Sequence, residues 1–338
     1  MKPKIALRHI AFCLLFAIFL ILPFVNDSRT LLILLTQIFI FGILAMSYDI
    51  LLGYTGIVSF GHAMFFGIGA YTTAVMLKQM ENTMVIFVLS IVIGMLLAGL
   101  VSFLVGLLTL RLKSHFFAML TLAFSGLFLV LAEKLRTITF GNDGFTFRAP
   151  DMFRDRMTFY FFVLGSLVLI FLALYRFVNS PTGRILIAVR ENEQRTKSLG
   201  FNTLHYKVIA SVVAGIVASF AGSLYAVSLR FVNTSVMTMD ITLDALLMTI
   251  IGGVGTLVGP LLGAAVIEYA QHTLSGLGRD YPIFERWIIF FGILYILAVI
   301  FFPKGIIGTL RLLIWKWRGK VKNRKTQVAL PQEKERFE

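Results

Sequence analysis

Charged side chains of both signs gather in one short stretch, residues 180–200, between two long apolar runs. Ser180 is a residue type that caps helices, Pro181 suits a first helical position, and Gly200 suits a helix end. The stretch therefore predicts one amphipathic helix. Its apolar side comprises Ile185, Leu186, Ala188, Val189 and Leu199, and its charged side comprises Arg184, Arg190, Glu191, Glu193, Arg195 and Lys197. Lipid alone would not require both signs, so the pattern indicates binding to another protein, with a solvated connecting loop as the alternative.

Ionisable side chains are sparse within the apolar runs. Asp49, His62, Asp244 and Glu268 are the candidates, each expected near a helix end with a structural role in capping or interfacial hydrogen bonding. Such a set does not resemble the proton or sodium relay of a secondary transporter. The sequence also lacks a phosphate-binding loop, a His-Glu-x-x-His motif, a cysteine pair and a Gly-x-Ser-x-Gly motif. We therefore expect no catalytic site, no metal and no cofactor in this chain, and an energy source in a partner or an ion gradient.

Composition places the whole chain in a membrane. Of its 338 residues, 58% are apolar, 14% are charged and 33 are phenylalanine, whereas roughly a quarter of a soluble domain is charged. A bilayer requires about 20 apolar residues for each crossing. Uncharged runs of comparable length occupy residues 10–25, 31–48, 63–77, 84–110, 116–132, 158–175, 208–229, 245–267 and 287–302. Backbone groups cannot bond to water there, so these runs are predicted helices of an all-α polytopic membrane protein with eight to ten spans.

Lysine and arginine set the predicted orientation. If residues 245–267 cross twice, with a turn in the glycine-rich stretch 252–260, the chain has ten spans and both termini are cytoplasmic. The cytoplasmic pieces then hold 21 of the 31 basic residues and the outer pieces hold 10, as the positive-inside rule favours. With a single pass, the loop 179–207 and the basic C-terminal residues would lie on opposite sides.

This topology divides the chain into a cytoplasmic N-terminus, residues 1–9, a transmembrane domain, residues 10–303, and a cytoplasmic tail, residues 304–338. The transmembrane domain includes the cytoplasmic loop 179–207 and the outer loop 133–157. The tail carries ten basic residues, which favour contact with anionic lipid over nucleic acid.

Two glycine-interrupted stretches, residues 53–71 and 252–269, break the helical pattern in a similar way. Unwound backbone within a membrane is tolerated only where protein or a water-filled cavity satisfies it, so such a pair is a pointer to a translocation pathway. The alternative is close helix packing through small residues. The pathway candidates are Gly53, Gly56, Ser59, Gly61, His62, Gly252, Gly253, Gly255 and Gly259.

Six segments in register resemble the LivM-type permeases of branched-chain amino-acid ABC importers, from about residue 40 to residue 308. They are SYDILLGYTGIVSFGHAMFFGIGAY at 47–71, RLKSHFFAMLTLAF at 111–124, TFGNDG at 139–144, AVRENE at 188–193, GGVGTLVGPLLGA at 252–264 and FPKG at 302–305. The second and third favour LivM over its sister permease LivH. The resemblance makes residues 180–200 a coupling helix that docks on an ATPase. The ATPase-coupling candidates are Arg184, Arg190, Glu191, Glu193, Leu199 and Gly200.

The resemblance further implies a multi-pass protein of a bacterial or archaeal cytoplasmic membrane. Its expected partners are a LivH-like second permease, two ATPase subunits that use ATP, an extracytoplasmic solute-binding protein and membrane lipid. Branched-chain or related hydrophobic amino acids are the expected substrates. A urea or amide permease of the same family is one alternative. An ion-coupled secondary transporter or channel is another, and a membrane scaffold or enzyme without transport activity is a third.

Overall fold

The computed structural model describes residues 19–24, 28–112, 114–280, 289, 292–293, 296, 300 and 305–309. The eight longest helices in these residues are α2 (Arg29–Thr55), α3 (His62–Gln79), α4 (Met84–Thr109), α5 (Ser114–Lys134), α7 (Arg156–Asn179), α10 (Thr203–Leu229), α11 (Met239–Gly252) and α12 (Val258–Asp280). Five of the helices, α2, α4, α5, α7 and α10, are long and apolar enough to cross a membrane. The chain is thus polytopic, as predicted.

The count of ten spans and the location of the termini stay predictions. The described residues leave out most of two apolar runs, 10–25 and 287–302. They also leave out the N-terminus 1–9 and nearly all of the tail 304–338. The predicted domain boundaries fall there as well.

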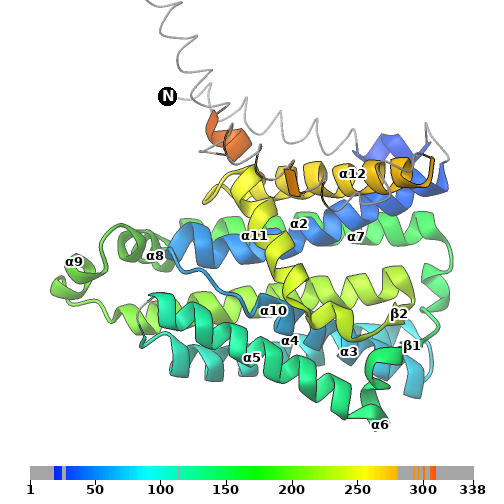
Figure 1. The fold of residues 1–338 in the computed structure, drawn as a ribbon, viewed down its shortest axis with the longest axis horizontal. Coiled ribbons are helices and arrows are strands. Elements are labelled where there is room, and N and C mark those ends of the chain that lie inside the picture. Colours follow the sequence, from blue (N-terminus) through cyan, green and yellow to red (C-terminus); the bar gives the residue numbers. More distant parts are fainter. Residues whose placement is uncertain are drawn as a thin grey trace, which may run out of the picture.

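The core lies where α2 and α10 pass through the middle of the bundle. Helix α2 contacts α7, α10, α11 and α12, and α10 contacts α3 and α4 (Figure 1). Ile43 and Leu44 of α2 and Ala218 of α10 are fully buried. By contrast, α4 and α5 expose apolar side chains such as Leu96, at 68%, and Met119, at 69%. Exposed apolar faces of this kind are expected of helices that face lipid or a partner helix.

The apolar run 245–267 forms parts of two helices that pack on each other. Helix α11 ends at Gly252 and α12 begins at Val258, so a turn over residues 253–257 interrupts the run; that both helices cross the membrane stays a prediction. Helix α11 has 14 residues, fewer than the roughly 20 of a full crossing. Gly253 and Gly255 have positive φ angles of 125° and 77°, which glycine adopts without a steric penalty.

Helix α2 ends because Gly56 adopts a left-handed conformation, with φ of 73°. Residues 56–61 then run without helical structure before α3 begins inside the bundle. Side chains from distant helices satisfy this backbone: Thr121 accepts a hydrogen bond from Phe60 N at 3.2 Å, and Thr242 accepts one from Ala63 N at 2.9 Å. The interruption is therefore built into the core.

The two ends of the bundle differ (Figure 1). The α8 end carries α8 (Pro181–Glu191), α9 (Glu193–Ser198), the end of α2 and the 253–257 turn. The opposite end carries α6 (Arg136–Thr139), η1 (Gly141–Asp143), β1 (Phe145–Thr146), η2 (Asp151–Phe153), β2 (Phe231–Val232) and η3 (Thr234–Met237). There β1 pairs with β2 in antiparallel register, so the all-α prediction misses one two-residue ladder. The 133–157 loop forms a packed cap, because Phe145, Phe147 and Phe153 are buried within it.

Candidate functional site

The predicted amphipathic helix is two helices, which corrects the prediction of one continuous element. Its start is as predicted: Pro181 is the first residue of α8, and Ser180 Oγ accepts a hydrogen bond from Gly183 N at 3.3 Å. The break comes at Asn192, which is extended and ends α8. Its side chain accepts a hydrogen bond from Arg195 N at 2.9 Å and thereby caps α9. Gly200 follows α9 with φ of 89°.

Helix α8 lies with one face on the bundle and the other exposed. Leu186 and Val189 are 0% and 4% exposed, whereas Arg184, Ala188 and Glu191 are exposed and Ile187 is 37% exposed. Leu199, predicted on the apolar side, is 70% exposed. The exposed residues of α8 recur every three or four positions along one face. We call the face formed by Arg184, Ile187, Ala188 and Glu191 the outer face of α8.

Arg190 and Glu193, two of the ATPase-coupling candidates, bond within the chain, and their contact with a partner stays a prediction. Arg190 Nη1 donates a hydrogen bond to the carbonyl oxygen of Gly53, near the end of α2. Glu193 accepts hydrogen bonds from Lys207 Nζ at 2.7 Å and Thr203 Oγ1 at 3.0 Å, and pairs with Lys197 at 3.0 Å. Both side chains therefore fix α8 and α9 to the bundle.

The charge state of Glu193 follows from these bonds. Partial burial raises the pKa of this carboxyl, but the hydrogen bonds from Lys207 and Lys197 outweigh burial and lower the pKa to about 2. Glu193 is therefore ionised at neutral pH. Since its side chain remains 36% exposed, water screens these pairs, and they serve mainly to set the position of α9.

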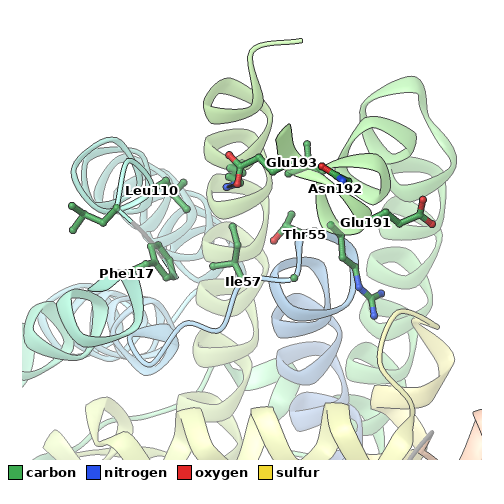
Figure 2. A pocket seen from close by; sticks show the side chains of 12 residues that line it. Thr55, Ile57, Leu110, Phe117, Glu191, Asn192 and Glu193 are labelled. Atoms are coloured by element: carbon green, nitrogen blue, oxygen red, sulfur yellow. Dashed lines mark hydrogen bonds and ion pairs between the residues drawn. The ribbon is translucent and has the colours of Figure 1, made fainter. Parts of the chain in front are cut away.

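A cavity of about 300 Å³ lies between α8 and the ends of α2, α4, α5 and α10. Its apolar wall includes Ile57, Leu110 and Phe117, which form a small hydrophobic cluster with Val208. Figure 2 shows Ile57 and Phe117 on the floor of this space, and Glu191 pointing away from it. The cavity thus separates the α8–α9 segment from α4 and α5.

The two glycine-interrupted stretches meet at the α8 end. Asp49, which is fully buried in α2, accepts hydrogen bonds from Gly255 N at 2.7 Å and Leu257 N at 3.3 Å. A Cβ atom added to Gly255 would lie 3.1 Å from both Gly53 O and Arg190 Nη1. Gly53 and Gly255 thus lie next to each other, and the two stretches meet at this point.

Other glycines serve close packing. A Cβ atom at Gly252 would collide with the carbonyl group of Gly259. Gly253 has a positive φ angle, which residues with a side chain rarely adopt. Gly56 lies beside Arg190, since an added Cβ would be 3.2 Å from Arg190 Cγ. Packing and backbone conformation thus account for these glycines, and their place on a pathway stays a prediction.

The family of the branched-chain amino acid transport system permease component matches residues 30–299, most of the chain. The chain belongs to this permease family. The match includes α8, α9, the end of α2 and the 253–257 turn, so the site just described lies within the part that defines the family.

Curated relatives are themselves permeases. The LivM permease protein of Salmonella typhimurium is 29% identical over 160 residues, 46% of this chain and 36% of that protein. A probable LivM protein of Methanocaldococcus jannaschii is 27% identical over 159 residues, 44% of this chain and 46% of its own. The ribose import permease protein RbsC of Escherichia coli is 30% identical over 117 residues, 32% of this chain and 36% of that protein.

These alignments cover about a third to a half of the length of the relatives. The resemblance to LivM-type permeases and the assignment to a multi-pass membrane family are confirmed at this level. No solved structure matches this chain.

The remaining pathway candidates of the permease lie deeper in the bundle. His62 is fully buried, with Nε2 2.7 Å from Ser47 Oγ. Ser59 is 2% exposed and its carbonyl accepts a hydrogen bond from Tyr48 at 3.0 Å, while Gly61 abuts the backbone of Thr121. The structure does not bring these three residues to the cluster of Asp49, Gly53 and Gly255.

Among the four ionisable candidates of the permease, Asp49 and His62 have the bonded structural role that was predicted. The helix-end prediction is wrong for Glu268, which lies in the middle of α12. The reason is that α12 continues to Asp280, well beyond the apolar run. Among the described residues, no group of three or more His, Cys, Asp or Glu side chains could hold a metal ion.

Sequence reasoning missed Asn192 as a helix break and Lys207 as the partner of Glu193. A signal for the first existed, because asparagine followed by an acidic residue is a common helix start. No local signal marks the bond between Asp49 and Gly255, since 206 positions separate them.

Proposed function

We propose that this chain is the permease subunit of a binding-protein-dependent ABC importer for branched-chain or related hydrophobic amino acids. The observation that carries the proposal is the family match over residues 30–299. The α8 end is cytoplasmic in this proposal, as the distribution of basic residues favours. The partners would be a LivH-like second permease, two ATPase subunits that bind and hydrolyse ATP, an extracytoplasmic solute-binding protein and membrane lipid.

The outer face of α8 is the proposed contact with an ATPase subunit. It combines Arg184 and Glu191 with the apolar Ile187 and Ala188, and it projects from an element held firmly by Leu186 and Val189. A mixed face on a capped, anchored helix suits a protein groove, because apolar area supplies affinity and charges set the register. Leu199 and Gly200, at the end of α9, are exposed as well.

The substrate class is proposed from the names of the relatives, and the test compares amino acids with the other substrates that those names give. Three of the relatives are LivM permease proteins, while others are ribose and autoinducer 2 import permease proteins. Urea or a short amide is the further alternative. Proteoliposomes with the purified complex should take up leucine, isoleucine or valine, and excess ribose or urea should not compete. Competition by ribose or urea alone would contradict the amino-acid assignment.

A matched pair of variants tests docking. Ile187→Glu places a charge on the outer face of α8 and should abolish co-purification of the ATPase with the permease. Arg176→Glu changes an exposed residue in the last turn of α7 and should leave co-purification intact. Uptake driven by an ion gradient, with no ATPase bound to the wild-type chain, would contradict the proposed function and favour a secondary transporter.

A further inference from the structure

The turn between α11 and α12, residues 253–257, is held by groups from distant segments. The carboxylate of Asp49 in α2 accepts hydrogen bonds from the backbone of Gly255 and Leu257 at 2.7 and 3.3 Å. Arg190 in α8 donates to the carbonyl oxygen of Gly53, one helical turn beyond Asp49. An added Cβ on Gly255 would lie 3.1 Å from both Gly53 O and Arg190 Nη1, so the two bonds are adjacent and form one cluster.

The cluster joins the exposed helix α8 to the interior. Val189, the neighbour of Arg190, is buried against the bundle, and Glu191 belongs to the outer face. A displacement of α8 would therefore reach Gly53 through the Arg190 side chain and reach the turn through Gly255. A Cβ atom at Gly305 would also collide with the backbone of Gly253, so Gly305 packs on the same turn.

Two features indicate that the turn can change conformation. Leu257 has φ of 53°, an unfavourable backbone conformation for leucine that persists only where the surroundings impose it. The carboxylate that imposes it is fully buried, which is unfavourable for a charged group unless its hydrogen bonds are kept. Thr256 also bonds within the turn, to Gly253 and Gly259, so the turn can keep its own shape while its bonds to Asp49 change.

We propose that Asp49 and Arg190 form a latch that ties the 253–257 turn to α8, so that movement of α8 opens the transport path at this end. The inference rests on the proposed docking of an ATPase to α8. Both are positioning residues, because neither has to touch the transported solute. Arg190 links α8 to α2, and Asp49 links α2 to the turn.

The latch predicts a specific defect in two variants. Arg190→Ala removes the donor to Gly53, and Asp49→Asn keeps the size but replaces one acceptor oxygen with a donor that faces backbone N–H groups. In both, ATP hydrolysis should continue while solute uptake per ATP falls by about tenfold or more, the effect of losing a charged hydrogen bond. Arg190→Lys retains charge and a donor and should recover at least part of the coupling.

The test uses the complete transporter in proteoliposomes, with uptake and ATP hydrolysis measured together. Arg176→Ala and Asp151→Asn are matched controls at exposed positions and should keep the wild-type ratio. The double variant Asp49→Asn with Arg190→Ala should lose no more coupling than the worse single variant, because both changes break one latch. An unchanged ratio in Arg190→Ala, or independent losses that multiply in the double variant, would overturn the latch.

A labelling measurement keeps the test decisive if Asp49→Asn fails to assemble. In a background with Cys13 replaced by alanine, a cysteine at the half-buried Val254 reports on exposure of the turn. ATP should change its alkylation rate in the wild-type background and leave the rate unchanged in Arg190→Ala. An equal ATP response in both backgrounds would overturn the latch. A wild-type chain that binds no ATPase would instead contradict the proposed function, and the latch with it.

Discussion

Replacing Gly263 with alanine tests how closely α11 and α12 are packed. A Cβ atom at this position would collide with the carbonyl oxygen of Met248 in α11 and lie 2.7 Å from its carbonyl carbon. Carbon atoms in contact are normally about 3.5–4.0 Å apart, so the helices would have to separate by about 1 Å. Overpacking of this kind typically costs about 1–3 kcal/mol. We expect a lower thermal midpoint of the purified protein in detergent and a lower membrane yield.

Gly276 in the same helix provides the matched control. An added Cβ atom there would meet nothing within 4 Å, and alanine is favoured over glycine within a helix by about 1 kcal/mol. Gly276→Ala should therefore keep or raise the thermal midpoint. The difference between the two variants isolates packing, because the helix-propensity gain is common to both. Equal midpoints for Gly263→Ala and Gly276→Ala would refute the close packing of α11 on α12.

Three further predictions concern the α8 end and the orientation of the bundle in the membrane. Leu186→Ala should destabilise the anchoring of α8 by about 2–5 kcal/mol, because the side chain is fully buried. Limited proteolysis should then cleave α8 faster, whereas Ile187→Ala should match the wild type. Glu193 has a pKa lowered from 4.5 to about 2, so its bonds stabilise the fold fully above pH 4.5 and are lost as the pH falls through about 2. The midpoint difference between wild type and Glu193→Gln should shrink over that window, and a constant difference would contradict this assignment. A cysteine at Asn192 should be alkylated from the cytoplasm and one at Asn142 only from outside, and labelling of both from one side would refute the orientation.

Much of the local structure could be predicted because it depends on neighbouring residues. Ser180 and Pro181 mark the start of α8, and Gly56 marks the end of α2, through conformations that these residue types favour. The break between α11 and α12 follows from the glycine-rich stretch 252–260. These inferences need no knowledge of tertiary contacts.

The candidate site was harder to predict because its contacts join distant residues. Arg190 and Glu193 look like partner-binding charges in the sequence, and the sequence does not show that both also bond to distant residues, Gly53 and Lys207. The bond between Asp49 and the turn depends on packing that places α2 beside α11 and α12. Helix periodicity gives the faces of a helix, but it does not say which face meets which neighbour.

The start of α3, directly after the non-helical stretch 56–61, has a consequence for biogenesis. The N–H of Ala63, at the start of α3, finds its acceptor in Thr242, a residue that the ribosome adds 179 positions later. Until α11 enters the membrane, the beginning of α3 lacks that partner, and an unsatisfied backbone group in lipid costs several kcal/mol. During synthesis the start of α3 must therefore stay in contact with water or with other protein. The amino-terminal half of the protein reaches its final form only after the carboxy-terminal half is inserted.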